Sequence, residues 1–456
     1  MNKETVKQIK EIAGAENVLE SLEERICYSY DGTFQRGIPD LVVFPANTRE
    51  VAQIVKLANQ ERFPIFPRGA GTGLSGGSIP QSGGAALVLT RMNKIKEISV
   101  DDMLAVVEPG VITERLHQEV EKLGLFYPPD PGSLKTCTLG GNVAENAGGP
   151  RAFKYGVTKD YVLGLEVVTP QGDVMRTGGR TVKNVTGYDL TRLLTGSEGT
   201  LGIVTEIILK LLPKPKEVRT ALVAFNKLEE AAVTITGMII NGVIPTTLEI
   251  MDHITIDCVE RQLCLGLPKD VEAILLIEVD GGKSQVEEDI KTIEKICRDN
   301  HCRDLQVASS PAEREKLWKA RRAVSSAVVQ LAPTKISEDA TVPRSRIPEM
   351  LKRLREIAAK YQLHIPVFGH AGDGNLHPNI ITDKKDKDEM ARVEKAIEEI
   401  FRTALELRGT LSGEHGIGVM KKPYLYWELG EVGLNYLRAI KQAVDPHNIL
   451  NPGKIF

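Results

Sequence analysis

Apolar residues recur along the chain in two patterns, short continuous runs typical of buried strands and stripes with helical spacing. The two patterns alternate, which predicts a mixed α+β protein. Strands are predicted at residues 41–44, 65–66, 86–89, 104–107, 220–225, 273–279, 335–339 and 365–368. Helices are predicted at residues 1–25, after a cap at Asn47 or Thr48, from 113 onwards, and at 227–240, 284–300 and 311–330.

One helical stripe and one change in composition add detail. In the helix from residue 113, the spacing of Leu116, Val120 and Leu123 predicts that all three face inward. The composition shifts after Pro213-Lys214-Pro215-Lys216, which predicts a domain boundary there. The chain is therefore expected to form a first domain over residues 1–213 and a second from 214.

Composition describes an ordinary globular protein. The 456 residues suffice for two or three domains, 42% of them are hydrophobic, and the net charge is −3. No apolar run has the length of a membrane span, and the N-terminus lacks the apolar core of a signal peptide. The six cysteines form no Cys-x-x-Cys pair, which argues against a zinc knuckle or an iron–sulfur cluster. A cytoplasmic location with reduced thiols is expected.

A glycine-rich loop from Pro67 to Gly77 follows the strand at 65–66. Gly71, Gly73 and Gly76 formally match the dinucleotide-binding fingerprint, but the residues that follow cannot open a helix. No Asp or Glu occurs between Gly69 and Lys96 to hold a ribose. The loop can still bind phosphate through a nest of backbone N–H groups, or it can be purely structural.

Two further glycine-rich segments follow, one at residues 138–149 and another at 196–205. Small residues let a backbone approach a ring system and a pyrophosphate closely, while hydroxyl and amide side chains supply directional bonds. Three such segments in one domain therefore indicate a large, flat ligand that carries phosphate.

A different chemistry is suggested by Gly369-His370-Ala371-Gly372-Asp373-Gly374-Asn375-Leu376-His377. In an extended strand His370 and His377 would lie on opposite faces, but the intervening glycines permit a tight reversal that joins the two imidazoles. Downstream, Ser412-Gly413-Glu414-His415-Gly416 supplies a carboxylate. Two imidazoles and one carboxylate form a three-ligand set for a divalent metal with open positions. The alternative is that the two histidines merely cap a turn.

Together these segments resemble a known family. Pro-Arg-Gly-x-Gly-Thr-Gly, Leu-Gly-Gly-Asn-x-Ala-x-Asn-Ala-Gly-Gly and Gly-Ser-Glu-Gly-Thr-Leu-Gly are similar to the FAD domain of the vanillyl-alcohol oxidase type. The histidine and Ser-Gly-Glu-His-Gly segments resemble the C-terminal domain of its 2-hydroxy-acid dehydrogenase branch. The resemblance covers essentially the whole chain. It implies a two-subdomain FAD-binding domain at 1–213, an antiparallel α+β cap domain at 214–440, and a C-terminal return to the FAD domain at 441–456.

The resemblance also implies the cofactor contacts. FAD is expected to be non-covalent, because no histidine precedes residue 117 to form the covalent bond seen in some relatives. The expected FAD-binding residues are Pro67, Arg68, Gly69, Ala70, Gly71, Thr72, Gly73, Ser75, Gly76, Pro131, Gly132, Ser133, Thr138, Gly140, Gly141, Asn142, Ala144, Asn146, Ala147, Gly148, Gly149, Glu198, Gly199, Gly202, Ile203, Val204 and Asn451.

For catalysis, a metal (zinc, iron or manganese) on His370, His377 and Glu414 would bind the hydroxyl and one carboxylate oxygen of a D-2-hydroxy acid. D-lactate and glycolate are the foremost candidates. His415 is the expected base and flavin N5 the hydride acceptor. Arg321 would clamp the substrate carboxylate, although a solvated helix face is the alternative for its charged neighbourhood. By resemblance, Lys335, Ser325 and Asn379 join the site.

Other functions remain open at this point. The chain could be a metallohydrolase, in which a metal-bound water does the chemistry. It could also be a non-catalytic FAD-binding subunit of a larger oxidoreductase. If the chain is a dehydrogenase, it lacks a cysteine cluster and a nicotinamide fingerprint through which electrons could leave. An electron-transfer flavoprotein or an iron–sulfur subunit is therefore the expected partner.

Overall fold

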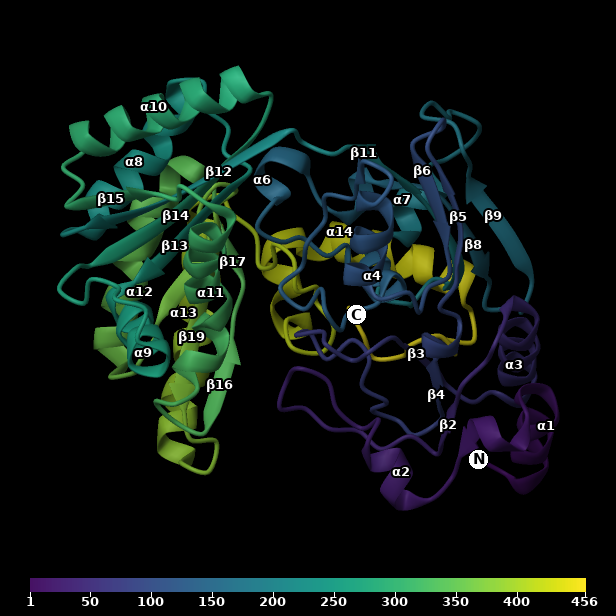
Figure 1. The fold of residues 1–456 in the computed structure, drawn as a ribbon. Coiled ribbons are helices and arrows are strands. Elements are labelled where there is room, and N and C mark those ends of the chain that lie inside the picture. Colours follow the sequence, from purple (N-terminus) through teal and green to yellow (C-terminus); the bar gives the residue numbers. More distant parts are fainter. The chain divides into compact units, whose positions relative to one another are not determined.

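The computed structural model describes all residues from Met1 to Phe456 and divides the chain into two compact units. The first unit comprises residues 1–148, 157–214 and 414–456, and the second comprises residues 149–156 and 215–413 (Figure 1). The change of unit at 214 lies where the composition shifts. The chain re-enters the first unit at 414, earlier than the expected residue 441, because the loop from 416 to 420 is hydrogen-bonded to Glu198 and Ser75.

The first unit begins with a four-stranded sheet in the order β1-β2-β4-β3, in which β2, β4 and β3 are parallel. These strands are β1 (Val18–Leu19), β2 (Leu41–Val43), β3 (Ile65–Arg68) and β4 (Ala85–Val88). The helices of this part are α1 (Lys3–Ala13), α2 (Leu22–Ile26) and α3 (Thr48–Glu61). The Asn47 side chain caps α3 by accepting the Glu50 N–H. The N-terminal helix ends at Ala13 and not near 25, because Gly14 follows it with a φ of 86°.

The second part of this unit is a five-stranded antiparallel sheet in the order β5-β6-β10-β8-β9. Its strands are β5 (Ile95–Ser99), β6 (Leu104–Val107), β8 (Val162–Val168), β9 (Val174–Gly178) and β10 (Ile203–Lys210), with β7 (Leu125–Phe126) and β11 (Leu212–Pro213) forming a separate pair. The helices here are α4 (Thr113–Glu121), α5 (Leu139–Glu145) and α7 (Leu190–Leu194). Leu116 and Val120 are buried as predicted, but Leu123 lies beyond the end of α4 and is 48% exposed.

The C-terminal residues complete the first unit. After α14 (Leu425–Val444), residues 449–451 run beside β3. The Ile65 N–H donates to the Ile449 carbonyl at 2.8 Å, and the Asn451 N–H donates to the Ile65 carbonyl at 2.8 Å. The free edge of β3 is thereby covered.

The second unit is built on one antiparallel sheet in the order β15-β12-β14-β13-β18-β19-β16, with β17 also paired to β19. Its strands are β12 (Glu217–Phe225), β13 (Thr247–Asp252), β14 (Ala273–Gly281), β15 (Asp304–Val307), β16 (Thr334–Ser337), β17 (Ala340–Thr341), β18 (Val367–His370) and β19 (Asn375–Thr382). Its helices are α6 (Ala152–Tyr155), α8 (Leu228–Ile240), α9 (His253–Leu263), α10 (Lys283–Asp299), α11 (Pro311–Val328), α12 (Ile347–Tyr361) and α13 (Lys387–Glu406).

Two sets of helices cover this sheet. Helices α8 and α10 pack together on β12 and β14, while α9 and α11 pack together on the apolar face that includes Met251, Leu276 and Phe368 (Figure 1). The short segment 149–156 joins the same unit through Lys154, whose Nζ lies 2.5 Å from Asp280 Oδ1. The structure is thus the expected α+β architecture, with antiparallel sheets in both units.

Candidate active site

The hairpin of β18 and β19 brings His370 and His377 together. His370 pairs with Asn375, and Phe368 pairs with His377. Because every second residue of a strand shares a face, this register places both histidines on one face as diagonal neighbours. Their ring centroids are 5.2 Å apart with the planes nearly perpendicular, and both residues are buried. The turn uses Gly374, whose φ of 87° favours glycine.

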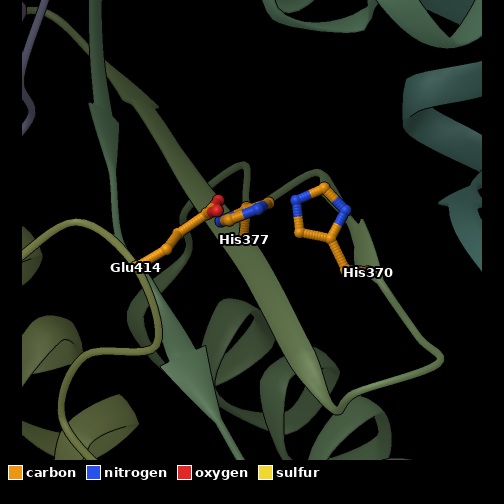
Figure 2. A group of neighbouring side chains, drawn as sticks. All are labelled: His370, His377 and Glu414. Atoms are coloured by element: carbon orange, nitrogen blue, oxygen red, sulfur yellow. The ribbon is translucent and has the colours of Figure 1, made fainter. Parts of the chain in front are cut away.

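Glu414 is the third member of this cluster. The potential ligand atoms of His370, His377 and Glu414 all lie within 4.8 Å of one another (Figure 2). Two imidazoles and one carboxylate suit a divalent ion such as zinc, iron or manganese. These three side chains therefore fit a metal ion and are the residues that would hold it.

Glu249, which the sequence did not suggest, orients His370. It lies directly opposite His370 in the pairing of β13 with β18, and its Oε1 is 2.5 Å from His370 Nδ1. Glu249 is fully buried, which alone would raise its pKa, but Arg321 and then His370 outweigh burial and lower the pKa below its ordinary value. An ionised Glu249 can only accept a hydrogen bond, so the His370 proton sits on Nδ1. The lone pair is then on Nε2, the form of imidazole that binds a metal.

Helix α11 supplies a polar stripe to the same face of the sheet. Arg314 and Trp318 both donate to Glu278, Arg321 pairs with Glu249, and Ser325 accepts a hydrogen bond from Lys335. The four helix positions are separated by three or four residues, so they fall on one side of the helix. Arg322 instead faces outward and pairs with the exposed Glu315. Of these two arginines, Arg321 is the one that faces the sheet, and its binding of a substrate carboxylate stays a prediction.

The remaining expected substrate residues lie on neighbouring strands. Lys335 Nζ donates to Ser325 Oγ at 2.5 Å, and burial lowers the pKa of the Lys335 amine. In the pairing of β16 with β19, Lys335 lies opposite Ile381 and Ser337 lies opposite Asn379, so all four share the histidine face. Asn379 is fully buried, and its Oδ1 accepts no hydrogen bond within the protein. A buried orphan acceptor of this kind is consistent with a ligand-binding face.

The segment that leads to Glu414 is firmly held. The buried Asp339 carboxylate accepts hydrogen bonds from Ser412 Oγ and from the Gly413 N–H, both at 2.9 Å. A Cβ on Gly413 would collide with Thr341, so only glycine allows this close packing. Glu414 and His415 follow at once, and both are half-buried.

In the first unit, the loop after β3 offers its backbone N–H groups to a ligand. The carbonyl of Gly73 accepts the Gly32 N–H, and the carbonyl of Ser75 accepts two N–H groups from Val419 and Met420. By contrast, none of the N–H groups from Ala70 to Ser75 donates a hydrogen bond within the protein. Successive backbone N–H groups without an acceptor in the protein are a feature of anion-binding nests. The loop therefore fits the pyrophosphate of FAD.

The three glycine-rich segments meet in this unit. Asn451 Nδ2 donates to the carbonyls of Gly77 and Glu198, which joins the first segment to the third. The Glu198 N–H donates to the Ala144 carbonyl, which joins the third segment to the second. Gly132 is exposed, and a Cβ there would meet nothing within 4 Å. The hydrogen bonds bring small residues of the three segments close together, as contact with a large flat cofactor requires.

Several expected FAD residues have structural roles as well. Thr138 caps α5 through the Gly141 N–H, and Asn142 donates to Thr113. Asn146 ends α5 with a φ of 56° and accepts the Lys159 N–H. Gly140 and Gly202 are needed for packing, because a Cβ would meet Pro109 at the first and Val167 at the second. Gly149 belongs to the second unit.

Comparisons with known proteins agree with this architecture. Residues 39–178 match the family described as the FAD binding domain, and residues 214–455 match that described as FAD linked oxidases, C-terminal domain. The chain is 50% identical to the glycolate oxidase subunit GlcD of Bacillus subtilis (strain 168), covering 100% of this chain and 97% of that protein. It is 36% identical to the D-lactate dehydrogenase of Anaerostipes hadrus, covering 99% and 97%. The solved structure of a 4-ethylphenol oxidase from Gulosibacter chungangensis superposes with a TM-score of 0.82 at 20% identity, covering 99% and 96%.

The fold and the matched domains define an FAD-dependent oxidoreductase of the vanillyl-alcohol oxidase type. The chain belongs to the family of FAD-linked oxidases that contains glycolate oxidase subunits and D-lactate dehydrogenases. This confirms the prediction of an FAD-dependent dehydrogenase of the 2-hydroxy-acid branch. None of its helices combines the length and hydropathy needed to cross a bilayer.

Proposed function

We propose that this protein oxidises a small 2-hydroxy acid to the 2-oxo acid, with glycolate and D-lactate as the foremost substrates. The observation that carries the proposal is the cluster of His370, His377 and Glu414, in which Glu249 sets the tautomer of the first histidine. The names of the relatives support the substrate class. When bound, FAD would supply the hydride acceptor, and a divalent metal would supply a Lewis acid for the substrate hydroxyl.

The side chains then divide the work as follows. His370, His377 and Glu414 would hold the metal, and His415 would accept the hydroxyl proton of the substrate. Arg321 is anchored to Glu249 through Nε, and no hydrogen bond within the protein engages its two terminal nitrogens. A guanidinium whose two terminal nitrogens are available can bind a carboxylate through both of them. Lys335 adds a second positive charge on the same face of the sheet.

Each turnover leaves two electrons that must reach an acceptor. We include in the proposal a separate redox protein, either an electron-transfer flavoprotein or an iron–sulfur subunit. Two observations support it: the Bacillus relative is named as a subunit, and the six cysteines of this chain include no Cys-x-x-Cys pair. The prediction is slow turnover with oxygen or NAD alone and rapid turnover with an artificial dye.

The decisive experiment is anaerobic bleaching of the flavin absorbance by glycolate, D-lactate, L-lactate and D-2-hydroxyglutarate. We expect bleaching by one or more of these acids in protein loaded with Zn²⁺, Mn²⁺ or Fe²⁺, and none in chelated protein. His370→Ala and His377→Ala should lose bleaching while retaining FAD, since both ligands lie in the second unit. Bleaching at the full rate by chelated protein would refute the metal role. Failure of every hydroxy acid would refute the substrate class.

Acid precipitation tests the mode of FAD attachment. We expect the flavin to remain in the supernatant, because the loop after β3 contains no histidine. A yellow pellet would indicate a covalent bond.

A further inference from the structure

The loop that follows Glu414 and His415 is fixed from one side by a buried carboxylate. Glu198 Oε1 accepts the Ile417 N–H and Glu198 Oε2 accepts the Gly418 N–H, both at 2.7 Å. Glu198 is only 5% exposed. When two successive backbone N–H groups donate to the two oxygens of one carboxyl group, the geometry of the contact is specific. The backbone at 417–418 therefore has one favourable position relative to Glu198.

Glu198 is itself held in an unusual conformation. Its φ of 52° is in the left-handed region, which costs energy for a residue other than glycine. Its own N–H donates to the Ala144 carbonyl, and its carbonyl accepts Asn451 Nδ2 at 2.6 Å. Such a conformation persists only where the surrounding bonds determine it. The surrounding structure thus keeps the side chain of Glu198 directed at the loop.

The loop is also packed too closely to shift freely. Gly416 and Gly418 have φ values of 83° and 49°, and a Cβ on either would collide with a neighbour. For Gly416 that neighbour is Glu145 Oε2, and for Gly418 it is the Ser75 carbonyl. The same carbonyl accepts the N–H groups of the next two residues. The two residues before this loop are Glu414 and His415.

We propose that Glu198 is a positioning residue that sets the metal ligand Glu414 and the base His415 by fixing the backbone of the loop after them. The sequence assigned Glu198 to FAD binding, but its carboxylate is directed at the loop. Asp339 holds the chain just before Glu414 through the Gly413 N–H, and Glu198 holds it at the third and fourth residues after. Loss of either anchor would let the two functional side chains drift. The expected effect on catalysis rests on the proposed function, whereas the expected effect on the position of the loop does not.

The test compares Glu198→Gln with Glu108→Gln. A glutamine at 198 presents one acceptor and one NH₂ group, so one of the two loop N–H groups loses its acceptor. Glu108 is a matched control, since it is a buried carboxylate of the same unit that accepts the Lys94 N–H and belongs to no proposed site. Hydrogen–deuterium exchange of the amides of residues 415–420 is the first readout, and it needs no substrate.

We expect exchange at 415–420 to accelerate at least tenfold in E198Q and to stay at the parent rate in E108Q. Mn²⁺ affinity, measured by titration of the metal alone, should fall about 10–100-fold in E198Q, as is typical when an outer partner of a ligand is lost. FAD content should match that of E108Q, and kcat should fall more than KM rises. Glu198→Asp keeps both acceptor oxygens, so amide exchange at 415–420 should be slower in this variant than in E198Q.

Unchanged exchange at 415–420 in E198Q would overturn the proposal, as would loss of FAD with the loop still protected. If E198Q does not fold, Gly416→Ala disturbs the same loop from the Glu145 side. It should also weaken Mn²⁺ binding with FAD retained, and normal Mn²⁺ affinity in folded G416A would overturn the proposal. If the parent protein oxidises no hydroxy acid, the proposed function fails while the exchange and Mn²⁺ results still decide the role of Glu198.

Discussion

Glu249 and His370 lie directly opposite each other on adjacent antiparallel strands, with Oε1 of the acid 2.5 Å from Nδ1 of the imidazole. Arg321 pairs with the other carboxylate oxygen. This one buried acid thus connects the cation proposed to bind the substrate with the histidine proposed to bind the metal. The contribution of Glu249 to metal binding and catalysis can be tested separately from the contributions of Arg321 and His370.

Glu249→Gln should weaken divalent-metal affinity and lower kcat, each about 10–100-fold, because the amide no longer fixes the His370 tautomer. Calorimetric titration with Zn²⁺ and steady-state kinetics measure the two effects. Glu278→Gln is the matched control, since Glu278 is a buried acid on the same sheet that receives Arg314 and Trp318 from the same helix. Both variants should lose some stability, but only the first should lose metal. Equal metal affinities in the two would contradict the assignment.

Arg321→Met and Arg322→Met form a pair of adjacent substitutions with opposite expectations. Arg321 faces the sheet and Arg322 pairs with an exposed acid, and exposed ion pairs contribute about 0–1 kcal/mol. Arg321→Met should raise KM for the hydroxy acid at least tenfold and lower the melting temperature, because it leaves the Glu249 charge without its main partner. Arg322→Met should leave KM unchanged. Similar KM values for both variants would show that Arg321 does not bind the substrate.

A pH dependence of stability is expected from Glu145. Burial, the neighbouring Glu198 and then Asp31 raise the pKa of Glu145 well above its ordinary value of 4.5, against smaller opposing effects of Ser75 and Lys421. Between pH 4.5 and the raised pKa of Glu145 in the folded protein, the folded protein therefore holds a proton that the unfolded chain has lost. Stability should fall as the pH rises from 4.5 through the folded pKa. A tenfold difference in proton affinity between the folded and unfolded states corresponds to about 1.4 kcal/mol.

Glu145→Gln imitates the protonated acid and should abolish this contribution. Melting temperatures should be measured from about pH 5 to about pH 8. At the highest pH the variant should melt at a higher temperature than the parent, and at the lowest pH the two melting temperatures should converge. An identical pH slope in both proteins would mean that Glu145 ionises normally.

The space beside Gly132 gives a test of the flavin site. A Cβ there meets no protein atom within 4 Å, so Gly132→Ala should fold as stably as the parent without flavin. If FAD approaches this residue, its affinity should fall about tenfold. Gly179→Ala, which also has open space around its Cβ, should bind FAD normally. Flavin fluorescence on titration with FAD distinguishes the two, and equal affinities would place the cofactor away from Gly132.

Local patterns were enough to predict most elements and the pairing of the two histidines. The apolar runs and helical stripes located the strands and helices, and glycines between His370 and His377 allowed a reversal. The sequence could not identify Glu249, because the contact joins residues 121 apart and depends on the order of β13 and β18 in the sheet. A single acid within the apolar run of residues 247–251 was the only available signal.

The loop anchored by Glu198 shows a second reason why the sequence alone could not predict every contact of the site. Its glutamate belongs to a glycine-rich segment typical of cofactor binding, so the sequence favoured contact with FAD. The direction of its side chain is set by a left-handed backbone and by bonds to Ala144 and Asn451, both distant in the chain. Turn preferences describe neither constraint, since both arise only when three glycine segments have packed together.

The contact of Ile65 with residues 449–451 has a consequence for synthesis on the ribosome. The second unit has all its strands once residue 413 has emerged, but β3 keeps an open edge until the last few residues of the first unit are made. At roughly 5–20 residues per second, that edge is exposed to other nascent chains for tens of seconds. An unpaired strand edge is a template for aggregation. The first unit should therefore depend on chaperones during translation far more than the second, although its core comes from the earlier part of the gene.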